Sequence, residues 1–295
     1  MISLLFALCT AFAEPYIAVI QSDSFVEYQK ATSSFLKHCN IKTRAYDIHG
    51  DKDLGLKRIK ELQEQNPRVI FAVGAKAAWL AKNELPNIPL VYTMVQNPER
   101  FGLRDAETIE IQMHPPKDLA VSQLQLFFPD IKHIAVFGSD NPTVEIEDYM
   151  RVMKEFGIET TLLKSSNTNS LRRTLNKLPN HIDAIWLPTD PTWLTPETFY
   201  HINNTGIKNA IPILSNSTYL AQAGALLSIS SNHESIGKLS ADIVTQVFDG
   251  ASIESLSNDH IAQEVYVTLN RNTQKSIGLE LEPFMLDFIN QQIAQ

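Results

Sequence analysis

Short polar stretches follow the apolar runs of this chain, and their side chains could bind a small zwitterion. The apolar run at residues 184–187, for example, is followed by Thr189, Asp190 and Trp193. Hydroxyl groups, amide groups and the N–H groups at a helix start can donate to a carboxylate. A side-chain carboxylate can in turn accept from an ammonium group. Loops of this kind could therefore supply both partners that an amino acid requires.

The candidate ligand-binding residues share one feature, which is a position after a strand-like run. They are Ser22, Ser24, Gly74, Ala75, Thr93, Gln96, Asn97, Ser139, Asn141, Thr189, Asp190, Trp193, Ser215 and Asn216. In open α/β sheets, ligands bind outside the carboxyl ends of the strands, and this rule selects these loops. We expect hydroxyl and amide groups from these loops to surround a small ligand.

Asp190 is the first choice for the ammonium partner, ahead of Asp23 and Asp140. Thr195 already supplies a cap for the helix that follows, so capping does not explain the carboxylate of Asp190. The candidates near a ligand carboxylate are Ser22, Ser24, Ala75 and Thr93. The candidates for an aromatic or apolar wall are Tyr92, Trp193 and Tyr219.

Most of these residues could instead have a purely structural role, because Ser, Thr, Asn and Asp are also the usual helix caps and turn formers. Ser24 stands three residues before Glu27, which is the spacing of a capping box, so we expect it chiefly to cap a helix. Tyr92 could instead belong to the core of a strand. Trp193 could pack between lobes rather than line a cleft.

Other chemistry finds no support in the sequence. The eight histidines are scattered, without the HExxH pattern or Cys/His pairs that hold zinc. There is no P-loop, no GxGxxG fingerprint and no GxSxG nucleophile turn. We therefore expect no metal, no cofactor and no enzymatic activity.

The composition is that of an acidic globular protein. The chain has 295 residues, of which 44% are hydrophobic and 20% charged, and this length predicts two domains. The net charge of -8 argues against nucleic acids and anionic membranes as main partners, because both require a basic surface.

The first 13 residues are apolar, carry no charge and end in Ala-Phe-Ala. This pattern predicts a cleavable signal peptide over residues 1–13, although the usual basic residues before the apolar run are missing. The alternative is a buried first strand. A lipoprotein at Cys9 is disfavoured because Leu8 stands where a small residue is required.

The elements that must position these loops alternate between strand and helix. Strands are expected at residues 16–21, 42–48, 68–74, 88–95, 133–138, 158–164, 183–188, 211–216, 225–230 and 264–270. Helices are expected at 24–38, 54–65, 75–85, 117–128, 143–156, 169–178, 196–206, 219–222, 233–250, 273–279 and 283–293. Near-continuous apolar strands are typical of parallel sheets covered on both faces.

A polar segment at residues 99–116 interrupts the alternation and contains a short strand-like pattern through Ile109 and Ile111. Two prolines, Pro115 and Pro116, end it. We interpret it as the crossing into a second lobe. The fold class is therefore α/β, with two doubly wound parallel-sheet lobes that are joined by more than one crossing.

Four stretches of the chain together form a recognisable pattern, namely FAVGAKAAWLAKNELPNIPLVYTMVQNPERFGL, DAIWLPTDPTW, AGALLSISSNHESIGKLSADIVTQVFDG and VYVTLNRNTQKSIGLEL. In register, they resemble one family of bacterial ABC-transporter substrate-binding proteins. The resemblance runs from about residue 16 to residue 282. Some members resemble binders of tryptophan or other aromatic amino acids.

The resemblance implies the type I periplasmic binding protein fold, with three crossings and a ligand in the cleft between two lobes that close about a hinge. It places the N-terminal lobe at 14–112 plus 233–254 and the C-terminal lobe at 113–232 plus 255–295. The implied function is solute binding for an ABC permease, in the periplasm or outside the cell, by a monomer. The alternative is a ligand sensor that partners a membrane signalling protein such as a sensor kinase.

Overall fold

The structure is a computed structural model that describes residues 14–138, 144–165, 168–188, 194–256 and 260–294. The chain divides into two compact units, which we call the first and the second unit. The first comprises Met1–Gln112 and Ile236–His260, and the second comprises Met113–Ser235 and Ile261–Gln295. The chain therefore passes between the units three times.

The sheet of the first unit has the strand order β11-β5-β4-β3-β1-β2. Its strands are β1 (Ile17–Gln21), β2 (Thr43–Asp47), β3 (Val69–Val73), β4 (Leu90–Thr93), β5 (Thr108–Gln112) and β11 (His260–Ile261). The pairs from β2 across to β5 are all parallel. Strands β1, β3 and β4 are buried at every residue, as their apolar sequences predict.

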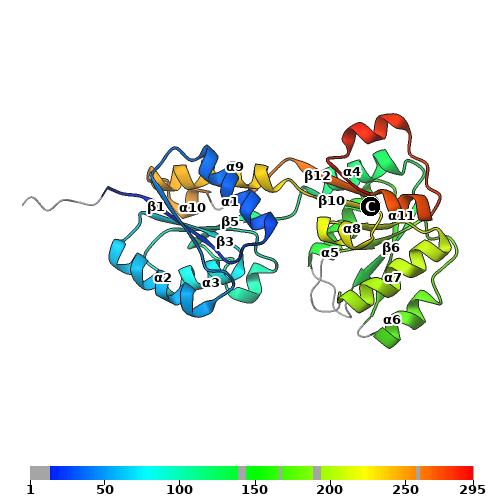
Figure 1. Ribbon diagram of the computed structural model, residues 1–295, viewed down its shortest axis with the longest axis horizontal. Coiled ribbons are helices and arrows are strands. Elements are labelled where there is room, and N and C mark those ends of the chain that lie inside the picture. The colour runs from blue at the N-terminus through cyan, green and yellow to red at the C-terminus, as the bar shows by residue number, and fades with distance from the viewer. Residues whose placement is uncertain (1–13, 139–143, 166–167, 189–193, 257–259, 295) are drawn as a thin grey trace, which may run out of the picture. The chain divides into compact units, whose positions relative to one another are not determined.

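Helices cover both faces of this sheet (Figure 1). They are α1 (Val26–His38), α2 (Lys52–Gln65), α3 (Ala75–Glu84), α9 (His233–Phe248) and α10 (Ile253–Leu256), with the 3₁₀ helix η1 (Pro98–Phe101). Helices α2 and α3 lie on one face and α1 and α9 on the other. The contact between α1 and α9 is close, because a Cβ on Gly237 would lie 2.2 Å from the carbonyl oxygen of Ala31.

The sheet of the second unit has the order β13-β12-β10-β9-β8-β6-β7. Its strands are β6 (His133–Gly138), β7 (Glu159–Lys164), β8 (Ala184–Leu187), β9 (Ile213–Ser215), β10 (Leu227–Ser231), β12 (Val265–Asn270) and β13 (Gln291–Ile293). Strand β12 runs antiparallel to β10, and the other described pairs are parallel. The predicted fold class, two doubly wound parallel-sheet α/β lobes, is thus confirmed, with β12 as an antiparallel exception.

The helices of the second unit again lie on both faces of its sheet. They are α4 (Lys117–Phe127), α5 (Val144–Glu155), α6 (Thr168–Leu175), α7 (Pro196–Asn209), α8 (Thr218–Ala223) and α11 (Arg271–Ser276), with the 3₁₀ helix η2 (Pro283–Phe288). Helix α7 begins as the sequence predicts. Thr195 caps it by accepting from the Thr198 amide at 3.2 Å, and Pro196 is its first residue.

Two sequence-based predictions about helices were wrong. Residues 283–293 do not form one helix, because Asn290 hydrogen-bonds to Val267 and the following residues join the sheet as β13. Ser24 is not the cap of α1, since the helix begins at Val26 with Phe25 at the cap position and without a side-chain cap. In both cases a contact with a distant segment prevails over the local pattern.

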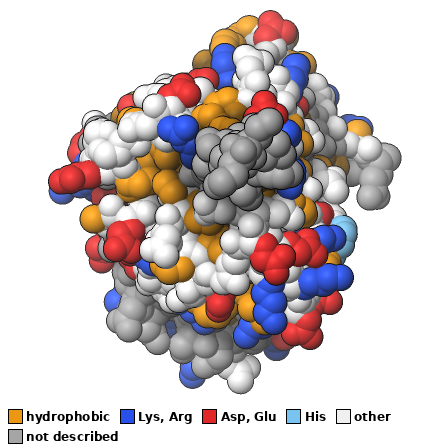
Figure 2. Space-filling model, turned by 90° about the vertical axis from the view of Figure 1, so that its left-hand side faces the viewer, with side chains coloured by type: hydrophobic (Ala, Val, Ile, Leu, Met, Phe, Trp, Pro, Cys, Tyr) orange, Lys and Arg blue, Asp and Glu red, His pale blue; other side chains and the backbone are white. Residues whose placement is uncertain are grey.

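The described surface carries charges of both signs. Acidic and basic side chains are interspersed with apolar ones on the face drawn in Figure 2. Among the described residues, no helix combines the length and the apolarity that crossing a bilayer requires. The predicted signal peptide, residues 1–13, lies outside the described residues.

Candidate functional site

The carboxyl ends of β1 and β3 form the topological switch point of the first sheet. The chain continues from β1 to β2 on one side, while β3 and β4 lie on the other. Gln21 and Val73, the last residues of β1 and β3, are paired in the sheet. Ligands of open α/β sheets bind at such points, so the loops after these two strands form the candidate site.

Gly74 connects β3 to α3 in a backbone conformation that only glycine adopts readily, with φ 90° and ψ 160°. A Cβ at this position would lie 2.7 Å from Oγ of Ser22 and 2.7 Å from Cε2 of Tyr28. The absence of a side chain therefore lets both neighbours pack against the start of α3. The N–H groups of the first turn, which begins at Ala75, make this helix end favourable for an anion.

Ser22 holds the start of α3 in place. Its hydroxyl accepts from the amide of Ala77 at 2.9 Å, and its own amide donates to Val73 at 2.8 Å. Thr93 is fully buried, and its hydroxyl donates to the carbonyl of Ile111 at 2.8 Å. Both were predicted ligand contacts, and the structure gives both side chains structural hydrogen bonds within the unit.

A network of four side chains, which we call the Ser24 network, joins the ends of β1 and β2. It consists of Gln21, Ser24, Asp47 and His49. Oδ2 of Asp47 accepts from Nε2 of Gln21 at 3.0 Å and from Oγ of Ser24 at 2.7 Å. Oγ of Ser24 also lies 2.9 Å from Nδ1 of His49. This network explains why Ser24 does not cap α1.

Phe25 lies on the surface beside this network, with 56% of the residue's surface exposed. Its ring contacts the ring of Tyr28 edge to face, with 5.5 Å between the centroids. Burial raises the pKa of the Tyr28 hydroxyl, and the carboxylates of Asp23 and Glu27 raise it further. Tyr28 thus stays neutral, and the pair offers an aromatic surface next to Gly74.

The loop after β4 holds two further predicted contacts. Gln96 is half-buried and makes polar interactions, and Asn97 is exposed with a φ of 55° at the start of η1. Asn97 therefore has the role of a turn residue. Tyr92, by contrast, is fully buried in the core, and this burial raises the pKa of its hydroxyl above the usual range. It is a core residue and not a ligand wall.

The second unit brings Ser215 and Asn216 to the end of β9. Ser215 is fully buried, and its hydroxyl donates to the carbonyl of Leu187 at 2.9 Å. Nδ2 of Asn216 donates to Glu145 at 3.4 Å, and Glu145 in turn pairs with His114 at 3.3 Å. Tyr219 follows with 65% of the residue's surface exposed, as a wall residue would be. This end of the sheet therefore also presents amide and aromatic groups.

The remaining predicted contacts follow β6 and β8 in the sequence. These residues, Ser139, Asn141, Thr189, Asp190 and Trp193, lie outside the described residues, as does Asp140. Their roles stay predictions.

Sequence reasoning missed Phe25, Asp47 and His49. Phe25 was not among the candidate residues, and the loop after the second strand was not considered. The signal was nevertheless present, because Asp47 is the last residue of β2 and His49 follows it after Ile48. Applied to every strand, the rule about carboxyl ends would have selected them.

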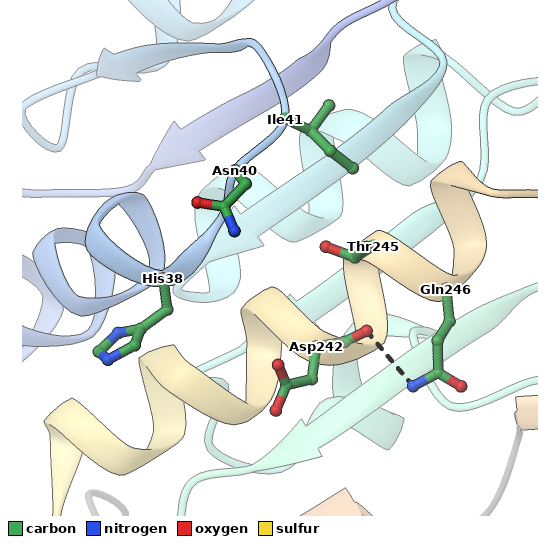
Figure 3. Close-up of a pocket in the computed structure, with 6 residues that line it drawn as sticks. All are labelled: His38, Asn40, Ile41, Asp242, Thr245 and Gln246. Atoms are coloured by element: carbon green, nitrogen blue, oxygen red, sulfur yellow. Dashed lines mark hydrogen bonds between the residues drawn. The ribbon is translucent and has the colours of Figure 1, made fainter.

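A pocket of about 350 Å³ lies elsewhere in the first unit, between the end of α1 and α9 (Figure 3). Its lining residues are His38, Asn40, Ile41, Asp242, Thr245 and Gln246. The end of α1 leads into the beginning of β2, so this pocket is remote from the carboxyl ends of the strands. Among the described residues, no group of three His, Cys, Asp or Glu side chains could hold a metal ion.

Comparisons with known proteins agree with this architecture. A tyrosine-binding protein of Clostridioides difficile (strain R20291) is 20% identical over 252 residues, which cover 82% of this chain and 72% of that protein. The ligand-free, open structure of a substrate-binding protein with adhesive properties from Clostridium difficile aligns with a TM-score of 0.77 at 18% identity, covering 96% of this chain and 100% of that one.

A second solved structure is the ABC domain from Streptococcus pneumonia in complex with L-Trp. It aligns with a TM-score of 0.62 at 17% identity and covers 94% of this chain and 100% of that one. The family model described as ABC transporter substrate binding protein matches residues 17–287. The chain therefore belongs to the family of ABC transporter substrate-binding proteins.

Proposed function

We propose that this protein binds an aromatic amino acid for an ABC-type uptake system. The family supplies the binding role. Two relatives favour the ligand class, since one is named for tyrosine binding and the other was solved with L-Trp. The single observation that carries the proposal is the exposed ring of Phe25, which lies with Tyr28 beside the start of α3 at the switch point of the sheet.

The proposed contacts follow from the chemistry of the described residues. The ligand carboxylate would accept from the N–H groups of Ala75 and Lys76 at the start of α3, because the N–H of Ala77 already donates to Ser22. The ligand ring would pack on Phe25, because stacked or edge-to-face aromatic pairs gain about 0.5–1.5 kcal/mol beyond the area that they bury. Asp23, which directly follows Ser22 in the chain, would accept from the ammonium group. Asp190 remains a second candidate for that role.

The proposal includes a partner and a location. Proteins of this family deliver a small molecule to a membrane permease, and we infer such an ABC permease as the partner here. The protein would accordingly work outside the cytoplasm, in the periplasm or at the cell surface. It would bind its ligand reversibly and catalyse no reaction. The sensor role stays an alternative, since the same ligand site would serve both.

Isothermal titration calorimetry with tyrosine, tryptophan, phenylalanine, arabinose and a nucleoside tests the proposal. We expect binding of aromatic amino acids by the unaltered protein. Phe25→Ala should raise their Kd by about tenfold or more, because the ligand ring loses its packing partner. Phe284→Ala is the matched control, since Phe284 is another exposed ring, at 51%, and belongs to the second unit. Equal effects of the two substitutions would contradict the proposed site.

A further inference from the structure

We propose that His49 selects ligands whose aromatic ring carries a hydrogen-bond donor, such as the hydroxyl of tyrosine or the indole N–H of tryptophan. This inference rests on the proposed function and adds a specificity-determining residue to it. It arises from the Ser24 network, which fixes the position of the proton on the His49 imidazole.

The hydrogen bonds of Ser24 determine which nitrogen of His49 carries the proton. The carboxylate of Asp47 can only accept, so the hydroxyl proton of Ser24 points to Asp47 at 2.7 Å. Oγ of Ser24 must then accept from Nδ1 of His49, which lies 2.9 Å away. A neutral imidazole has one proton, so Nε2 is left as an acceptor.

This acceptor is available to a ligand. The side chain of His49 is 65% exposed, and within the described part of the chain Nε2 has no hydrogen-bond partner. The backbone of His49 is also held in the left-handed region, with a φ of 48°, by the bond from its amide to Oδ1 of Asp47 at 2.8 Å. Asp47 thus fixes both the backbone and, through Ser24, the ring.

The position of His49 matches the far end of a bound aromatic amino acid. His49 follows β2, whereas the start of α3 follows β3, and β1 lies between these two strands. Two strand spacings amount to about 10 Å. An extended tyrosine, measured from its carboxylate to its ring hydroxyl, is of comparable length. Phe25, which follows β1, would lie against the ring between these ends.

The test compares ligands with and without the ring donor. Tyrosine is compared with phenylalanine, and tryptophan with 1-methyltryptophan, by titration calorimetry. We expect the unaltered protein to bind the donor-bearing member of each pair about tenfold more tightly, as one hydrogen bond to a buried ligand group would produce. His49→Asn should remove this preference by weakening tyrosine while leaving phenylalanine nearly unchanged. Asparagine tolerates the left-handed backbone, so the fold should persist.

Two further variants complete the experiment. His38→Asn is the matched control, because His38 is an exposed histidine of the same unit that lines the pocket between α1 and α9. It should leave both preferences intact. Ser24→Ala should reduce the preference, and ¹⁵N spectra of the histidine rings should show the proton of His49 on Nδ1 before the substitution and redistributed after it.

The outcomes separate the two proposals. Failure of every aromatic amino acid to bind would contradict the proposed function itself. Binding of phenylalanine as tightly as tyrosine by the unaltered protein would overturn the role of His49 and leave the proposed function standing. An equal loss for all four ligands in His49→Asn, or a proton on Nε2 in the spectra, would overturn it as well.

Discussion

Gly74→Ala should destabilise the protein strongly, although it adds only one methyl group. The backbone at Gly74 lies in a region that is open almost only to glycine, at a cost of about 1–3 kcal/mol for another residue. The new Cβ would also lie 2.7 Å from both Ser22 and Tyr28, and overpacking of this kind costs about 1–3 kcal/mol. Together we expect a loss of about 2–6 kcal/mol in the free energy of unfolding.

Urea unfolding followed by circular dichroism measures this loss, and calorimetry should show a fall in Tm of about 4 °C or more. Gly102→Ala is the control in the same unit. Gly102 also has a positive φ, 62°, but nothing lies within 4 Å of its added Cβ, so only a backbone cost of about 1–2 kcal/mol is expected. If Gly74→Ala costs no more than Gly102→Ala, the close packing of Ser22 and Tyr28 at this turn is refuted.

Three other substitutions test the first unit. Ser22→Ala should cost about 0.5–2 kcal/mol in urea unfolding, because the start of α3 loses a cap, and an unchanged midpoint would contradict that role. Gly237→Ala should also destabilise the protein, because the new Cβ would meet the carbonyl of Ala31. Alanine has the better helix propensity, so a gain in stability would refute the close contact between α1 and α9. Although burial would raise the pKa of Asp105, the hydrogen bond from Lys82 helps to hold it below its ordinary value. Asp105→Asn should therefore lower the free energy of unfolding at pH 7, and the difference from the unaltered protein should vanish as the pH falls well below about 3.9; a difference that is independent of pH would refute this pairing.

The sequence predicts the layers of this fold well, because the strands bear a strong apolar signal. Strands β1, β3 and β4 are buried at every residue, and their sequences are correspondingly continuous in apolar side chains. The apolar pattern does not reveal that β12 runs antiparallel to β10. The direction of a strand depends on its pairing in the folded sheet and not on its own sequence. The same reason explains residues 283–293, whose helical period was overridden by pairing with β12.

The candidate site is less predictable, because polar residues at strand ends serve two purposes. Ser22 and Thr93 were selected for their positions at strand ends, yet their hydroxyls bond within the protein. Ser24 was assigned to a local cap, whereas it bonds to Asp47, 23 residues away. Local patterns therefore locate the loops, and only the tertiary contacts divide their side chains between structural roles and roles in binding.

A thermal-shift screen tests the central claim most directly, because a ligand that binds only the folded protein must raise its Tm. The screen would cover all amino acids, simple sugars and nucleosides. We predict stabilisation by tyrosine or tryptophan, amounting to about 2.7 kcal/mol at a ligand concentration one hundred times Kd. Stabilisation by a sugar or a nucleoside, with no response to any aromatic amino acid, would contradict the claim.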